Sequence, residues 1–138
     1  MKINLSEQQC EKIKDVALKN KLDLVVIFGS QVKGRTNMES DIDIGIYGSS
    51  FWDLDDNKIN LVRDFSEIFK SDKIDMVVIT LNSPQLALQI LTEGKVLYEM
   101  ERNIFGMLKL RAWKLYAESK QFRDNSYAIL KSRIASLN

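Results

Sequence analysis

The sequence contains no histidine and a single cysteine, Cys10, among its 138 residues. Without histidine, Ser-His-Asp and Cys-His catalytic arrangements are excluded, and so are the common histidine-ligated zinc sites. One cysteine also excludes an internal disulfide and any thiolate metal cluster. Any catalysis must therefore rely on carboxylates, hydroxyls, lysine, arginine or backbone groups, together with a hard cation that binds oxygen.

Long apolar segments are missing as well. No apolar run approaches the roughly 18 residues that a membrane-spanning helix requires, so no membrane partner is expected. Residues 1–6 lack the apolar stretch of a secretory signal, which makes the cytoplasm the expected location. The apolar fraction, 45% of 138 residues, suits one ordinary domain with one hydrophobic core.

Charge is nearly balanced overall, at +1, but it is distributed unevenly. Residues 1–98 hold 12 basic and 15 acidic side chains, a balance of −3, whereas residues 99–138 hold 8 and 4, a balance of +4. The basic tail indicates either contact with an acidic partner or an ordinary solvated helix face. Direct binding of nucleic acid is not expected, because the front part is acidic and shows no groove of basic and aromatic residues.

Periodicity divides the chain into alternating helices and strands. The predicted helices cover residues 7–20, 55–69 and 84–93, with a helical tail from about residue 103, and the predicted strands cover residues 24–28, 41–47, 73–80 and 96–98. No linker or repeat interrupts this pattern. The sequence therefore predicts one α/β domain, in which residues 1–98 form the core and residues 99–138 form the tail.

The ends and faces of the predicted helices carry their own signals. Ser6 and Gln9 have the form of a capping box, and Asp55 or Asp56 is the expected N-cap of the second helix. That helix is expected to bury a stripe at positions 59, 62, 65 and 69. Pro84 fits the first turn of the third helix, and Gly94 fits the glycine-favouring position just past its end.

Two aspartates lie in the second predicted strand. Asp41 and Asp43 are two residues apart, so their carboxylates project from the same face, opposite three isoleucines. Close carboxylates repel each other and resist burial unless a cation lies between them. The pair suits phosphoryl or nucleotidyl transfer, in which two metals about 3.5–4 Å apart hold the attacking and leaving oxygens. Taken alone, however, such a pair more often marks a half-exposed strand with a polar outer face.

Further polar residues lie beside neighbouring strands. Asp75 interrupts an apolar strand, where a charge is costly without a partner. It would complete a metal site and accept the proton of an attacking hydroxyl, unless it is simply a solvated charge at the strand entry. Gly29 and Ser30 follow a buried strand, and their free N–H groups and hydroxyl suit the phosphates of a nucleotide, or form a plain turn. Lys33 is placed to neutralise phosphate charge or lies on the surface.

The combination resembles the signature of the DNA polymerase β nucleotidyltransferase superfamily. Gly29-Ser30 is followed, after ten residues, by Asp41-Ile42-Asp43. The segments around these residues closely resemble the minimal nucleotidyltransferase branch, and Asp75 matches the place of the family's third carboxylate. The resemblance covers roughly residues 22–98. Its departures are mild, with Val32 where alanine is usual and Lys33 where arginine is usual.

The resemblance implies a polymerase β-like α/β fold, with a short mixed sheet flanked by helices and a C-terminal helical tail. It implies that Asp41 and Asp43 ligate two Mg²⁺ ions, and that Asp75 ligates one ion and helps to activate the acceptor hydroxyl. Gly29, Ser30 and Lys33 would bind the phosphates of the nucleotide. The implied reaction transfers a nucleoside monophosphate from an NTP, with ATP as the expected donor, and releases pyrophosphate.

The tail bears on the identity of the acceptor. Its apolar and small residues recur at spacings of three and four from Phe105 to Ile129, which is typical of a packing seam. A continuous helix from residue 103 to 136 would span roughly 50 Å, longer than a small domain is wide. It would then need a partner protein or a second copy, as in a homodimer. The alternative is a break near residues 119–125 and a fold-back onto the core.

Small single-domain chains with this motif and tail resemble the antitoxins of HEPN/MNT toxin–antitoxin pairs. That resemblance implies transfer of AMP to a tyrosine of a helical HEPN ribonuclease, which silences it. One alternative is an antibiotic-type nucleotidyltransferase that modifies a small hydroxylated molecule. Another is a non-catalytic module that neutralises a toxin by binding alone, although binding gives no reason to hold Asp41, Asp43 and Asp75 together.

Overall fold

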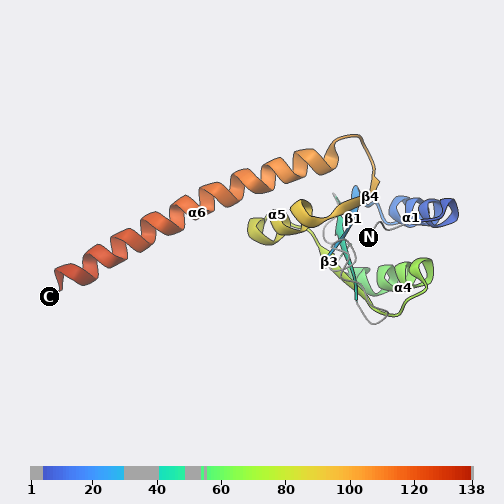
Figure 1. Ribbon diagram of the computed structural model, residues 1–138, viewed down its shortest axis with the longest axis horizontal. Coiled ribbons are helices and arrows are strands. Elements are labelled where there is room, and N and C mark those ends of the chain that lie inside the picture. Colours follow the sequence, from blue (N-terminus) through green and yellow to red (C-terminus); the bar gives the residue numbers. More distant parts are fainter. Residues whose placement is uncertain (1–4, 30–40, 49–53, 55, 138) are drawn as a thin grey trace.

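The computed structural model describes residues 5–29, 41–48, 54 and 56–137 and shows a mixed four-stranded sheet flanked by helices (Figure 1). The elements are α1 (Glu7–Lys19), β1 (Leu24–Phe28), β2 (Ile42–Tyr47), α4 (Lys58–Phe69), β3 (Ile74–Val78), α5 (Pro84–Glu93), β4 (Lys95–Glu99) and α6 (Ile104–Ser136). The strand order is β3-β2-β1-β4. β1 is antiparallel to β2 and β4, whereas β2 and β3 run parallel. The predicted α/β fold class is confirmed.

Each face of the sheet carries its own layer of helices, with α1 and α4 on one side and α5 and α6 on the other (Figure 1). β1 shows why the chain needs both layers. Val25 and Ile27 join the cluster under α1 and α4, while Leu24 and Val26 join the cluster under α5 and α6. A strand buried on both faces reads as a continuous apolar run, and the sequence predicted β1 from that run.

The first helix begins as its capping signals predict. The Ser6 hydroxyl accepts a hydrogen bond from the Gln9 backbone N–H at 3.1 Å, and the Gln9 side-chain oxygen accepts one from the Ser6 N–H at 2.9 Å. The Gln9 amide also donates to the carbonyl of Ile68, at the end of α4, at 3.0 Å. The cap therefore does more than start α1, since it also ties α1 to its neighbour α4.

The expected stripe of α4 is partly wrong. Ile59 is 84% exposed, and the buried residues are Leu61, Phe65 and Ile68. The helix begins at Lys58 after Asn57, which makes no side-chain capping bond, rather than at Asp56. Asp55 lies outside the described residues. The sheet selects positions 61, 65 and 68, which share one face at helical spacing, and turns position 59 toward solvent.

Pro84 opens α5 after Ser83, as predicted, although the Ser83 side chain makes no capping hydrogen bond. The helix also ends at Gly94 as predicted, but for a different reason. Gly94 has an extended backbone, with φ −82° and ψ 163°, and not the left-handed conformation of a glycine cap. A Cβ added there would lie 2.6 Å from the carbonyl oxygen of Ile90 and would overlap Val26. Glycine is needed at this position because the chain passes so close to β1.

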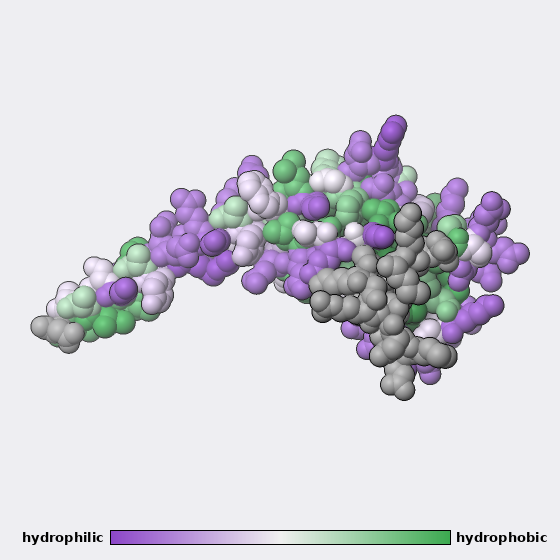
Figure 2. Space-filling model, viewed as in Figure 1, coloured by the Kyte–Doolittle hydropathy of each residue, from purple (hydrophilic) through white to green (hydrophobic). Residues whose placement is uncertain are grey.

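The last helix is continuous, so of the two alternatives left open by the sequence, the break near residues 119–125 does not occur. α6 runs for 33 residues from Ile104 to Ser136, packs along α5 through its first part, and then projects away from the sheet (Figure 1). Only Leu108 and Ala112 are buried in it. Figure 2 shows hydrophobic surface at its free end, next to strongly hydrophilic surface. None of the helices in the described ranges has the length and apolar character that crossing a bilayer would require.

Candidate active site

Two of the predicted site residues lie side by side in the sheet. Asp43 in β2 and Asp75 in β3 are direct partners in the parallel register of these strands. Gly45, two residues after Asp43, faces Ile90 of α5, and Val77, two residues after Asp75, packs in the cluster under α5 and α6. Because side chains alternate along a strand, both carboxylates project on the face that carries α5 and α6.

Asp41 lies just before β2 and completes the acidic group. It is two residues from Asp43, and its side chain is exposed, as is that of Asp75, whereas Asp43 is half-buried. The three predicted carboxylates therefore occupy one end of the β2–β3 pair. The innermost of them, Asp43, is the one most strongly affected by its surroundings.

Gly29 approaches this group from β1. It follows the last residue of that strand, Phe28, which is the register partner of Asp43 in the antiparallel β1–β2 pair. Gly29 has φ +80°, a left-handed conformation that glycine adopts without strain. A Cβ added to Gly29 would overlap the Asp43 carboxylate and lie 3.0 Å from its Cγ. Both its backbone conformation and its closeness to Asp43 therefore require a glycine.

The acidic group is electrostatically strained. Burial, the largest cause, raises the pKa of the Asp43 carboxyl above its ordinary value of 3.8, and the negative charges of Asp75 and then Asp41 raise it further. Desolvation and like-charge repulsion both disfavour the ionised form of a carboxyl group. A bound cation would reverse both effects, because it supplies the opposite charge and ligates the oxygens directly.

The donors suit a hard cation such as Mg²⁺, which binds carboxylate oxygens and keeps several ligands from water or substrate phosphates. Among the described residues, no group of three or more Asp, Glu or Cys side chains is gathered closely enough to hold a metal ion. Asp43 and Asp75 offer carboxylates from two adjacent strands.

Ser30 and Lys33 lie outside the described residues, so their predicted contacts with phosphate remain predictions. The pairing of Phe28 with Asp43 and the close approach of Gly29 to Asp43 were not predicted from the sequence. The glycine after an apolar strand was a visible signal for close approach, but it did not reveal what approaches. That depends on the register between β1 and β2, which residue spacing alone does not specify.

Comparison with known proteins places this geometry in a family. The profile of the family described as polymerase beta nucleotidyltransferase matches residues 11–103. The protein adenylyltransferase MntA of Aphanizomenon flos-aquae (strain 2012/KM1/D3) is 32% identical over 114 residues, which cover 72% of this chain and 72% of that protein.

Solved structures agree in fold. A chain from a toxin–antitoxin crystal structure with AMP-PNP matches with a TM-score of 0.63 and 26% identity, over 91% of this chain and 98% of that one. A chain from the complex of the tri-AMPylated Shewanella oneidensis HEPN toxin with its MNT antitoxin matches with a TM-score of 0.59 and 23% identity, over 93% and 98%. At that identity, the second match supports the fold alone.

Proposed function

We propose that this chain, which belongs to the polymerase beta nucleotidyltransferase family, is an antitoxin that acts as a protein adenylyltransferase. It transfers AMP from ATP to a tyrosine hydroxyl of a partner HEPN ribonuclease toxin and releases pyrophosphate. The observation that carries the proposal is the pairing of Asp43 with Asp75 across parallel strands, with Gly29 packed against Asp43. The relationship to MntA and the fold match to a toxin–antitoxin complex with AMP-PNP support it.

The proposed roles follow from the positions of the side chains. Asp41 and Asp43 would each contribute oxygens to two Mg²⁺ ions, and Asp75 would contribute to one of them. When bound, the ions supply positive charge that offsets the charge of the triphosphate. Gly29 leaves room at the end of β1, and we assign the binding of the phosphates to Gly29, Ser30 and Lys33. We assign the reaction to the cytoplasm, where ATP is available as the donor.

We assign the acceptor to Asp75, the carboxylate beside Asp43 in the neighbouring strand. Asp75 is exposed, whereas Asp43 is half-buried, so an incoming tyrosine can reach Asp75 more easily than Asp43. The tyrosine oxygen forms a bond to the α-phosphorus, and the bond from that phosphorus to the pyrophosphate oxygen breaks. The phenolic proton passes to the Asp75 carboxylate and from there to water. Asp75 therefore acts as a base on the acceptor, as well as a ligand.

The test is transfer of AMP to the toxin that is co-expressed with this chain, measured by intact-protein and peptide mass spectrometry. We expect one or more AMP increments on a tyrosine of the toxin in the presence of ATP and Mg²⁺, and none with a chelator. Asp43→Asn should lower the rate by about 10³-fold or more, because the amide cannot replace a charged metal ligand. Undiminished transfer by Asp43→Asn would refute the assignment.

The matched control is Asp72→Asn, which removes one charge from an exposed position three residues before Asp75. Its transfer rate should stay within about twofold of the parent chain, because a general loss of charge is screened by salt over the distances involved. Circular dichroism of both variants should be unchanged. Equal losses in the two variants would mean that overall charge, and not the Asp43 carboxylate, supports transfer.

A further inference from the structure

The distal part of α6, residues 119–136, carries apolar side chains that no described part of the chain covers. Phe122 is 73% exposed, and Ile129, Leu130 and Ile134 are each more than half exposed. Figure 1 shows this part of the helix projecting beyond α5, and Figure 2 shows hydrophobic surface near its tip. An apolar surface of this kind on a projecting helix is a feature of interaction sites. We refer to residues 119–136 as distal α6.

The exposed residues continue a face that is buried nearer the core. Leu108, Leu115, Phe122 and Ile129 follow one another at intervals of seven, which keeps them on one side of the helix. We call this row the α6 seam. Its members are 3%, 37%, 73% and 57% exposed in that order, so the row is buried at Leu108 and exposed farther along the helix. The same surface that packs on α5 thus runs on without a partner.

A cavity lies where the part of α6 that packs on α5 ends and its exposed part begins. This cavity of about 460 Å³ lies between the start of α5 and the middle of α6, and Leu86, Tyr116, Ser119 and Arg123 are among the residues that line it. The guanidinium of Arg123 lies 5.8 Å from the centre of the Tyr116 ring. Ser119 and Arg123 of distal α6 thus line this cavity together with the start of α5.

The charge of α6 argues against a second copy as the occupant. Residues 104–136 hold seven Lys or Arg residues and only two Asp or Glu residues. Two such helices packed together would bring like charges close to each other, which costs affinity. A partner with carboxylates around an apolar groove has the opposite character and gains from the same charges. The charge of α6 therefore favours an acidic protein surface.

The position of α6 links this surface to the active site. Asp43 and Asp75 project on the face of the sheet that carries α5 and α6, as Gly45 and Val77 show by their contacts on that face. The first part of α6 packs in the helix layer on that face, and distal α6 extends from this layer beyond the sheet (Figure 1).

We propose that distal α6, together with the cavity beside α5, is the docking site for the protein acceptor, and that it takes an apolar groove bordered by carboxylates. The inference rests on the proposed function, because it assigns the acceptor of that reaction to this surface. α6 supplies affinity and holds the acceptor, while the carboxylates of the sheet carry the chemistry. Substitutions in distal α6 should therefore weaken binding of the acceptor, whereas substitutions of the carboxylates should lower the rate of AMP transfer.

The test compares two double variants of the full chain. The substituted positions of the second variant lie one residue before those of the first. The seam variant is Phe122→Asp with Ile129→Asp, and the control variant is Gln121→Asp with Ala128→Asp. The control adds the same charge at the same interval, about 100° around the helix from the seam. All four side chains are exposed, so neither variant disturbs the core.

Binding of the co-expressed toxin is measured without ATP, and AMP transfer is measured with it. We expect the seam variant to weaken binding and to raise KM for the toxin by about tenfold or more, with the loss falling on KM rather than kcat. The control variant should lose only the small part of the affinity that two added negative charges cost near an acidic partner, so the seam variant should bind the toxin several-fold more weakly than the control. Toxin binding through the seam without any AMP transfer would overturn the proposed function and leave the docking site standing.

Three results would overturn the docking site itself. The first is a seam variant that binds and modifies the toxin as well as the parent. The second is a parent chain that is a dimer by light scattering and becomes a monomer in the seam variant, because the occupant is then a second copy. The third is seam-dependent binding to phosphatidylserine-containing vesicles with toxin affinity unchanged, because the occupant is then a membrane surface.

Discussion

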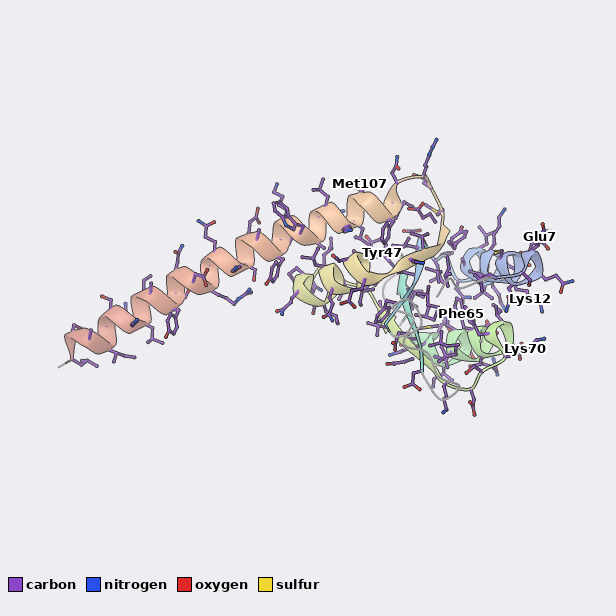
Figure 3. The ribbon with its side chains drawn as sticks, in the orientation of Figure 1. Glu7, Lys12, Tyr47, Phe65, Lys70 and Met107 are labelled. Atoms are coloured by element: carbon purple, nitrogen blue, oxygen red, sulfur yellow. The ribbon has the colours of Figure 1, made fainter. Side chains whose placement is uncertain are left out.

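Phe65 and Phe122 lie in helices of the same chain but in opposite surroundings. Phe65, in α4, is fully buried against the sheet (Figure 3) and stacks on Phe69 with ring centres 6.4 Å apart. Phe122, in α6, is 73% exposed. Burial of apolar surface stabilises the fold, while an exposed phenylalanine gives little stability and leaves apolar surface available to a partner. The core and distal α6 are therefore expected to respond to the same substitution in different ways.

The largest expected effect belongs to the core. Phe65→Ala should lower the free energy of unfolding by about 3–5 kcal/mol, because it removes a large buried side chain and leaves a cavity under α4. Urea unfolding followed by circular dichroism measures this loss. A change below about 1 kcal/mol would show that the core around Phe65 is loosely packed, and the contrast with α6 would then disappear.

A smaller effect of opposite sign is expected at the active site. Burial raises the pKa of Asp43 in the folded chain, with the charges of Asp75 and Asp41 adding to the effect, so ionised Asp43 costs stability. Asp43→Asn should therefore raise the melting temperature at neutral pH in the presence of a chelator. The residue that the proposed reaction needs most is thus one that the fold would be more stable without.

The cost of ionised Asp43 to the stability of the fold depends on pH. A carboxyl group with a raised pKa in the folded state binds its proton more tightly there than in the unfolded state. Its cost is therefore absent below the ordinary pKa of 3.8 and grows as pH rises through the raised value. The advantage of Asp43→Asn should shrink as pH falls toward 3.8. If the increase in melting temperature caused by Asp43→Asn is the same at every pH, it comes from packing and not from charge.

The contrast between core and α6 also explains how much of the fold the sequence predicted. The capping box at Ser6 and the apolar run of β1 are local signals, and the structure confirmed both. The prediction of the buried face of α4 was partly wrong. Apolar residues occur on adjacent faces of that helix, and only contact with the sheet determines which face is buried. The sequence also did not decide whether α6 is continuous, because helical spacing near residue 119 fits both a straight and a broken helix.

The site was predictable in its residue types and less so in its arrangement. The two-residue spacing of Asp41 and Asp43 and the charge of Asp75 in an apolar strand indicated neighbouring carboxylates. The direct register of Asp43 with Asp75, and the packing of Gly29 on Asp43, depend on how three strands align. Because β1 is apolar on both faces, its sequence does not distinguish the observed register from a one-residue slip.

The smallest expected effect on stability belongs to distal α6. Phe122→Ala should change the free energy of unfolding by no more than about 0.5 kcal/mol, because the side chain is mostly solvated and alanine favours a helix at least as well. Urea unfolding of the isolated chain tests this beside Phe65→Ala. A loss above 1 kcal/mol would mean that Phe122 is covered in solution, so that its surface is already occupied. Loss of toxin binding without loss of stability would instead assign the exposed face of α6 to recognition.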